Sequence, residues 1–220
     1  MSRRLQIDVF FDLICPWCLI GKRQLEHALV QFRSRHPDVQ VTTAWHGVQL
    51  LPQLPVEGEP FADFYRKRLG NADAMTMRQA QVQEAARAVG LAIDLSRIET
   101  MPNTADAHRL FQRATALGNA AQREMLLERL FAGYFQRREN LGDRETLLAI
   151  ARSCGLDSDT LVDCLKGDAT PFAAPPEATS GVPSFQFDQR VTVIGAQPAQ
   201  ALLGAMNEAL KHSERERQPA

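Results

Sequence analysis

The chain has 220 residues, of which 45% are hydrophobic and 23% are charged, and its formal net charge is −1. This length suits one large domain, or a small domain that carries an insertion. A charge this close to zero gives no global field that would attract nucleic acid or an anionic membrane, so neither is expected as a partner. The sequence has no apolar run of about 18 residues or more, which argues against a membrane span.

The first elements predict a β-α-β unit. In residues 5–11, apolar and polar side chains first alternate and then give way to a continuous apolar run, as in a buried strand. Helical spacing of leucines and Phe32 follows from Cys15 to about residue 35, and 36–38 read as a stop and turn. Residues 39–45 alternate in polarity and include β-branched side chains, so they predict a second strand. A right-handed crossover then makes the two strands parallel.

The middle of the chain reads as helical. Residues 49–60 contain three prolines and a glycine and form an irregular loop. Nearly everything from there to about residue 166 has helical spacing, with breaks at glycines and at Pro102. The expected helices lie near 61–69, 73–89, 104–118, 120–138, 143–153 and 158–166.

Strand character returns near the end of the chain. After a proline-containing loop at 168–181, two short strands at 184–187 and 191–194 are joined by a hairpin turn. A last helix is expected over 198–211. The polar tail at 213–220 has no apolar anchor and is expected to be flexible.

This order of elements predicts the α/β class and a thioredoxin-like fold with a large all-helical insertion. The thioredoxin-like domain is expected to comprise residues 1–60 and 168–212, and the inserted helical domain residues 61–167. The two halves of the sheet are therefore far apart in sequence.

Four consecutive residues carry the clearest chemical signal. Cys15 and Cys18 are separated by two residues where the first strand gives way to a helix. Because a helix N-terminus favours a thiolate, Cys15 is expected to be the more exposed and more acidic thiol and the nucleophile, and Cys18 to resolve the mixed disulfide. Pro16 stiffens the ring, and Trp17 offers an apolar face to a substrate. The alternative is a buried or metal-bound pair, but zinc takes about four ligands and no second close cysteine pair exists, so no metal is expected.

The start of the chain bears on the redox compartment. Arg3 and Arg4 are not followed by a separate apolar segment with a cleavage site, since the apolar run at 9–14 leads directly into the motif. We therefore expect a cytoplasmic protein, in which a pair of close cysteines is catalytic or metal-binding rather than a structural disulfide.

Gly181-Val182-Pro183 directly precedes the strand at 184–187. Proline is tolerated at the start of a strand. A cis Val182–Pro183 bond would turn the backbone of Val182 toward the dithiol, ready to pair with an extended substrate. Spacing alone favours trans, because cis is a small minority of X–Pro bonds.

Five stretches occur in an order that resembles the FrnE-like branch of the DsbA family, over nearly the whole chain. The resemblance implies a thioredoxin fold with a helical insertion, a redox pair at Cys15 and Cys18, and a cis bond before Pro183. The stretches are DLICPWCLIGKR at 12–23, PNT at 102–104, AHRL at 107–110, TSGVPSF at 179–185 and GAQP at 195–198.

The same resemblance implies that the helix after Pro102 faces the dithiol. Asn103 would then contact substrate and His108 would influence Cys15. The alternatives are that Asn103 caps the helix and that His108 is a partly buried polar residue. The expected substrate-binding residues are Pro16, Trp17, Asn103, His108, Val182 and Pro183.

The superfamily also contains 2-hydroxychromene-2-carboxylate isomerase and the kappa-class glutathione transferases, which resemble this chain in layout. Those relatives have serine where Cys15 stands, so the complete pair favours disulfide exchange with a protein or small-molecule thiol. A glutathione-dependent isomerase or transferase acting on a small aromatic substrate is the alternative. Residues 195–197 lack the Ser-Asp pair that holds glutathione in the kappa class, although the helix N-terminus at Pro198 could receive a carboxylate.

No tightly bound cofactor is expected, and glutathione remains open as a redox partner. A homodimer is compatible with the superfamily, but no stripe in the sequence establishes one. Cys154 and Cys164 could pair, or could form a second redox couple as in some FrnE-like proteins. Their spacing matches no close redox motif and their neighbours are apolar, so buried free thiols are expected.

Overall fold

The computed structural model describes residues 3–70, 72–168, 170–178 and 181–217. Thr179 and Ser180 of the quoted motif, and residues 218–220 of the expected tail, lie outside this set. The chain forms two compact units. The second contains the predicted insertion together with flanking segments that the sequence groups with the thioredoxin-like part. The first unit takes the described parts of residues 1–11, 17–46 and 175–220, and the second takes 12–16 and 47–174.

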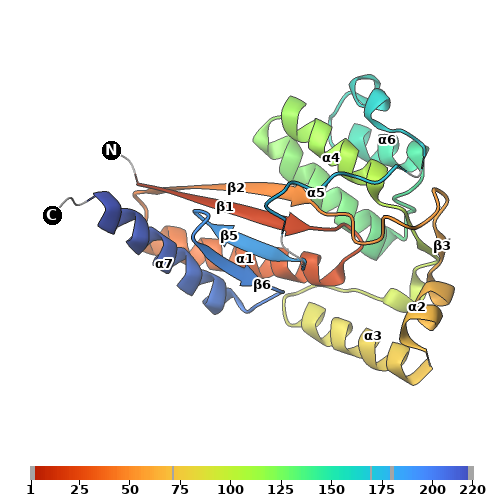
Figure 1. The fold of residues 1–220 in the computed structure, drawn as a ribbon, viewed down its shortest axis with the longest axis horizontal. Helices are drawn as coiled ribbons and strands as arrows, with labels where there is room; N and C mark the ends of the chain where they lie inside the picture. The colour runs from red at the N-terminus through yellow and green to blue at the C-terminus, as the bar shows by residue number, and fades with distance from the viewer. Residues whose placement is uncertain (1–2, 71, 169, 179–180, 218–220) are drawn as a thin grey trace. The chain divides into compact units, whose positions relative to one another are not determined.

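A four-stranded sheet in the order β2-β1-β5-β6 organises the first unit. β1 and β5 are antiparallel, with Val9 opposite Phe185, and β5 and β6 form an antiparallel hairpin. Helix α1 joins β1 to β2, and Figure 1 shows these two strands running in the same direction, as predicted. The elements are β1 (Arg3–Phe11), α1 (Pro16–Arg35), β2 (Val39–Gly47), β5 (Ser184–Phe187), β6 (Val191–Ile194) and α7 (Ala199–Arg217).

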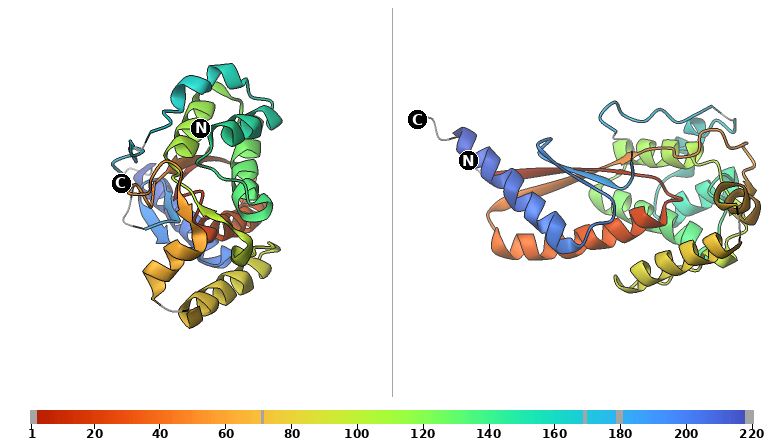
Figure 2. Two further views of the ribbon diagram at one scale, coloured as in Figure 1. Left: turned by 90° about the vertical axis from the view of Figure 1, so that its right-hand side faces the viewer. Right: turned by 60° about the horizontal axis from the view of Figure 1, so that its bottom comes forward.

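The core of this unit lies between the sheet and two helices. Figure 2 shows α1 and α7 on the same face of the sheet. Alternation along β1 directs its apolar side chains to that face, and the helices supply residues at spacings of three to four. Removing these side chains from water is the main stabilising term of the unit. The buried residues include Leu5, Ile7, Val9, Leu25, Ala28, Phe32, Phe185, Phe187, Leu202, Leu203, Met206 and Ala209.

The predicted hairpin between β5 and β6 is confirmed. Asp188 and Gln189 have φ angles of 50° and 57°, which suit a tight turn that matches the twist of the strands. The Asp188 carboxylate accepts a hydrogen bond from Gln6 N at 2.8 Å, and Asp188 N donates to Gln6 O at 2.9 Å. The turn is therefore fastened to β1.

The last helix differs from its prediction. α7 does not end at residue 211 but continues to Arg217, and the flexibility expected of the tail stays a prediction. Glutamate and arginine are good helix formers, and the sequence has no glycine or proline between residue 211 and Arg217. A helix can continue on backbone hydrogen bonds without an apolar anchor.

The second unit is mainly helical. Five of the six predicted helices are confirmed, with small changes at the ends of four of them and an earlier end for the helix expected over 120–138. Asn119 caps α5 through a reciprocal capping box with Gln122, and the Asp143 side chain accepts from Thr146 N at 2.8 Å to begin α6. The helices are α2 (Phe61–Leu69), α3 (Ala72–Arg87), α4 (Ala105–Leu117), α5 (Ala120–Ala132) and α6 (Arg144–Ser153).

Three features of this unit correct the sequence analysis. The helix expected over 158–166 is two 3₁₀ turns, Ser158–Thr160 and Val162–Cys164. The helix expected to reach residue 138 changes to a π-helical turn at Gly133–Arg137. The insertion is not wholly helical, because β4 (Thr100–Met101) pairs with β3 (Glu59–Pro60). Among the described residues, none of the helices has the length and apolar character that crossing a bilayer requires.

An ion pair closes the end of α5. Arg129 Nη1 and Nη2 lie 2.6 and 2.7 Å from the two carboxylate oxygens of Glu139. The hydrogen bonds from Arg129 hold the pKa of Glu139 below its usual value. A lowered pKa stabilises the fold above the unfolded pKa of about 4.3, and this contribution is lost as the pH falls through the lower folded value.

We therefore expect Glu139→Gln to lower the free energy of unfolding by about 1–2 kcal/mol at pH 7, and by much less at pH 3. Urea denaturation at both pH values measures this difference. An equal loss at the two pH values would contradict the argument, because the variant differs mainly in a charge that the wild type loses at low pH.

Candidate active site

The cysteine motif lies at the junction of β1 and α1, as predicted. Residues 12–15 form a turn in which Cys15 N donates to Asp12 O at 3.2 Å. Pro16 is the first residue of α1, where its missing N–H costs no helical hydrogen bond, and Cys18 lies within the first turn. Cys15 is 7% exposed and Cys18 is 1% exposed. Cys15 is thus the more exposed of the two, as expected, although both side chains are buried.

Asp12 anchors this turn. Its Oδ1 accepts from Ile14 N at 3.4 Å, and its Oδ2 accepts from Leu50 N at 2.7 Å. His108 Nε2, on α4, lies 3.1 Å from Asp12 Oδ1. Both side chains are fully buried, at 0% exposure. A carboxylate buried in this way is stable only when such hydrogen bonds replace water.

The imidazole of His108 is confined on two sides. Its ring stacks on Phe172 with 5.2 Å between the centroids. A Cβ at Gly47 would lie 2.4 Å from His108 Nδ1, closer than real side-chain contacts allow. Gly47 therefore makes room for the ring, which the hydrogen bond to Asp12 holds in place.

Asn103 supports the start of α4. Its side chain is buried, and Oδ1 accepts from Ala105 N at 3.0 Å and from Gln49 Nε2 at 2.8 Å. Its Nδ2 donates to Leu54 O at 2.7 Å. Gln49 Oε1 in turn accepts from Phe172 N at 2.7 Å. Asn103 thus joins the start of α4 to the loop at residues 48–58, which is close to the alternative in which it caps the helix.

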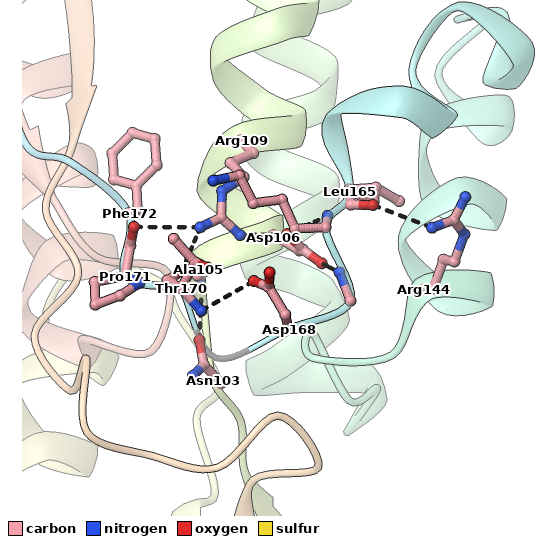
Figure 3. Close-up of polar contacts among 12 residues, drawn as sticks. Asn103, Ala105, Asp106, Arg109, Arg144, Leu165, Asp168, Thr170, Pro171 and Phe172 are labelled. Atoms are coloured by element: carbon pink, nitrogen blue, oxygen red, sulfur yellow. Dashed lines mark hydrogen bonds and ion pairs between the residues drawn. The ribbon is translucent and has the colours of Figure 1, made fainter.

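A strap, defined here as residues 165–168 and 170–172, is fastened to α4 (Figure 3). The Asp106 carboxylate accepts from Lys166 N at 3.0 Å and from Gly167 N at 2.8 Å. Arg109 donates to Asp106 at 2.6 Å and also to the carbonyls of Thr170 and Pro171. These bonds set the position of Phe172 at the end of the strap.

The Val182–Pro183 bond is cis, as the family resemblance implies. Pro183 O accepts from Gly195 N at 2.7 Å. Pro183 also packs on α1, since a Cβ at Gly21 would lie 3.1 Å from Pro183 Cγ. Gly21 is one helical turn after Cys18. Among the other expected substrate-binding residues, Trp17 and Val182 are half-buried, and Pro16 is buried.

Two tyrosines of the second unit lie within electrostatic reach of the turn. Burial raises the pKa of Tyr65, opposed by Arg78 and reinforced by negative charge on Cys15. Burial raises the pKa of Tyr134 well above its usual value, and the negative charge of Asp12 contributes. The sequence indicates only that both belong to aromatic residues at helical spacing.

Cys154 and Cys164 are free thiols, as predicted. Cys154 is buried, whereas Cys164 is only partly buried. Burial raises the pKa of both thiols.

Several residues of the site carry no distinctive signal in the sequence. Gly47, Gln49 and Phe172 lie in regions that read as strand end or loop, and their contacts join distant segments. Asp12 and Arg109 fall within the quoted motifs, which gives their positions but not their partners.

The fold and the cysteine turn define a thioredoxin-type scaffold with a two-cysteine motif at its first helix. Residues 6–207 match the family described as DSBA-like thioredoxin domain. The chain therefore belongs to the DsbA-like thioredoxin family, and the predicted α/β fold is confirmed.

Individual relatives agree with this assignment. The crystal structure of a probable DsbA oxidoreductase from Streptomyces coelicolor is 28% identical, with a TM-score of 0.80, covering 98% of this chain and 92% of that one. A 2-hydroxychromene-2-carboxylate isomerase has a TM-score of 0.62 at 14% identity, covering 97% of this chain and 100% of that one, and is similar in fold alone. The uncharacterized protein YwbO of Bacillus subtilis is 26% identical over 162 residues, which are 74% of this chain and 72% of that protein.

Proposed function

We propose that this protein is a thiol–disulfide oxidoreductase that uses Cys15 and Cys18. The observation that carries the proposal is the turn that places Cys15 immediately before the first helical residue, with Cys18 one turn further on. The family's redox chemistry and the similarity to a probable DsbA oxidoreductase support it.

The exchange proceeds in two steps. The Cys15 thiolate attacks one sulfur of a substrate disulfide, forms a mixed disulfide and releases the other substrate sulfur as a thiolate. Cys18, after losing its proton, attacks the Cys15 sulfur of the mixed disulfide. The products are a Cys15–Cys18 disulfide and a second substrate thiolate, so the substrate gains the two electrons that the protein loses. Oxidation of a substrate is the reverse sequence.

We assign substrate contact to Trp17 and Val182, whose side chains are half-buried, with Pro16 and Pro183 shaping the backbone beside them. The backbone of Val182 is suited to pair with an extended polypeptide. Asn103 and His108 are buried and hydrogen-bonded, so we assign them a supporting role rather than direct contact. Cytoplasmic location, glutathione as a redox partner and a homodimer stay predictions.

A trapping experiment tests the two-cysteine mechanism. In Cys18→Ser the mixed disulfide cannot be resolved, so the protein should accumulate covalently attached insulin chain during incubation with insulin. Intact-mass spectrometry detects the adduct, which dithiothreitol should remove. The wild type, which retains Cys18, serves as the control and should accumulate far less adduct.

The same variant separates the rival activity. A glutathione-dependent isomerase or transferase that uses a single thiol would keep its turnover without Cys18. Unchanged turnover in Cys18→Ser, with no trapped adduct, would refute the dithiol proposal.

A further inference from the structure

A cavity of about 860 Å³ in the second unit takes no part in the proposed exchange reaction, since neither Cys15 nor Cys18 lines it. Its walls come from the last turns of α3, the loop at 90–94, a 3₁₀ turn at Leu95–Arg97 and the π-helical turn. The volume is typical of a site that encloses a small molecule. The cavity is therefore a candidate binding site of its own.

Positive charge is concentrated around this cavity. Three arginines and one aspartate are its charged lining residues, which gives a formal charge of +2; they are Arg87, Arg97, Arg138 and Asp94. The whole chain, by contrast, has a formal net charge of −1. The three arginine side chains are exposed, so a ligand from solvent can reach them. The cavity therefore attracts anions, although the protein as a whole does not.

These three arginine side chains are not used within the fold. None of their guanidinium groups forms an ion pair or a hydrogen bond with another residue that the structure describes. Arg129 of the same unit, by contrast, lies 2.6 Å from a carboxylate oxygen of Glu139. Like charges gathered around one hollow repel each other, and a bound anion would offset that repulsion. Planar guanidinium groups bind phosphate and carboxylate oxygens in pairs.

Asp94 offsets only part of this positive charge. Its carboxylate accepts a hydrogen bond from Ser96 N at 3.1 Å and another from the Ser96 hydroxyl. Hydrogen bonds from Ser96 lower the pKa of Asp94, and the positive charges of Arg97 and Arg138 lower it further. The carboxylate thus stays ionised and fixed as the cap of the 3₁₀ turn, and a net positive charge remains for a ligand.

Arg138 is held in an unusual backbone conformation beside the cavity. It ends the π-helical turn with φ 61° and ψ 29°, and its N–H donates to Gly133 O. Glycine is the usual residue in this left-handed region, because a Cβ is strained there. An arginine at such a position points to a use for its side chain.

The walls of the cavity are fixed by the core. Leu91, Ile93 and Phe135 line it and are 7%, 5% and 3% exposed. Ala92 and Ile93 also have backbone N–H groups that donate to none of the described residues. A preformed hollow with unused donors suits a negatively charged ligand.

We propose that this cavity binds a small organic anion that carries two or more phosphate or carboxylate groups. The guanidinium groups of Arg87, Arg97 and Arg138 bind the anionic oxygens. Two negative charges match the +2 charge of the lining, and the volume exceeds that of a bare phosphate ion. The site is independent of disulfide exchange, because it contains neither reactive cysteine.

NMR titration of isotope-labelled protein with pyrophosphate and with citrate tests the proposal at low ionic strength, where charges are least screened. Both anions should shift the amide signals of residues 90–94, with Kd values of about 1 mM or lower. Acetate, which carries one charge, should bind about tenfold more weakly. Tighter binding of pyrophosphate would identify phosphate esters as the ligand class, and tighter binding of citrate would identify polycarboxylates.

Substitutions in the lining should change the affinity in opposite directions. Arg87→Gln and Arg138→Gln each remove one guanidinium group and should weaken binding about tenfold. Asp94→Asn removes the opposing charge, keeps a side chain that can cap the 3₁₀ turn, and should tighten binding about threefold. General damage to the fold would not produce a gain in affinity.

Two matched controls lie outside the cavity. Arg152→Gln makes the same change of charge at the end of α6, and Asp157→Asn replaces the aspartate that caps another 3₁₀ turn. Both variants should bind the anions within about twofold of the wild type.

Three results would each overturn the proposal. In the first, neither pyrophosphate nor citrate shifts residues 90–94 at about 10 mM. In the second, both lining arginine variants bind as the wild type does, or Asp94→Asn binds more weakly. In the third, acetate binds as tightly as citrate. Cys15→Ser should bind the anions normally, so failure of disulfide exchange would leave this site unaffected.

Discussion

Replacing Cys15 by serine is expected to reduce the rate of insulin reduction to that of the uncatalysed exchange, a fall of about 10³-fold or more. A serine hydroxyl is not ionised near neutral pH and cannot form a mixed disulfide. Cys18 cannot take over, because it is 1% exposed and lies within the first turn of α1. Turbidity of precipitating insulin B chain with dithiothreitol as reductant measures the rate.

Cys154→Ser is the matched control for this experiment. Cys154 is also a buried thiol, but it follows α6 and makes a 3.9 Å contact with Ser153 Oγ. Its replacement should leave the rate within about twofold of the wild type. Activity retained in Cys15→Ser but lost in Cys154→Ser would move the reactive centre away from the first helix.

Gly47→Ala is expected to cost about 2–4 kcal/mol in the free energy of unfolding. The added methyl would lie 2.4 Å from His108 Nδ1 and 3.1 Å from Phe172 Cε1. Neither neighbour can move freely, because Asp12 holds the imidazole and Gln49 holds the Phe172 backbone. Displacing the imidazole would also leave the buried Asp12 carboxylate short of a hydrogen bond. Urea denaturation measures the loss.

Gly204→Ala controls for the general effect of replacing glycine. Gly204 lies within α7, and no atom lies within 4 Å of a Cβ added there. Alanine should stabilise this helix by about 0.5–1 kcal/mol. A Gly47→Ala protein as stable as the wild type would mean that His108 is not confined as described.

Local patterns explain why most elements could be predicted from sequence. Alternation over residues 5–11 and helical spacing in α1 arise from one buried face, so a single segment contains the signal. The failure at 158–166 is also local. There the Asp157 side chain accepts from Asp159 N at 3.0 Å and Thr160 Oγ1 donates to Asp157 O at 2.8 Å. These bonds compete with helical ones and favour short turns.

The residues of the candidate site also differ in whether the local sequence indicates them. Cys15 and Cys18 belong to a short motif whose position at a helix start predicts a redox pair, whereas the cis bond before Pro183 is implied by the family resemblance. The Asp12–His108 hydrogen bond joins residues 96 positions apart, and the sequence around neither residue indicates its partner. Position 47 must be glycine because the His108 imidazole lies against it, and the position of that imidazole is set only by the folded structure.

The strand order has a consequence for synthesis of this protein on the ribosome. β1 lies between β2 and β5, so one edge of β1 has no neighbour until Ser184–Phe187 has emerged. The whole of α2 to α6 is translated in the interval, and during it the apolar side chains of β1 lack the cover that β5 and α7 later provide. Nascent chains stalled before residue 184 should therefore bind chaperones through their first segment, and release should follow once β5 is available.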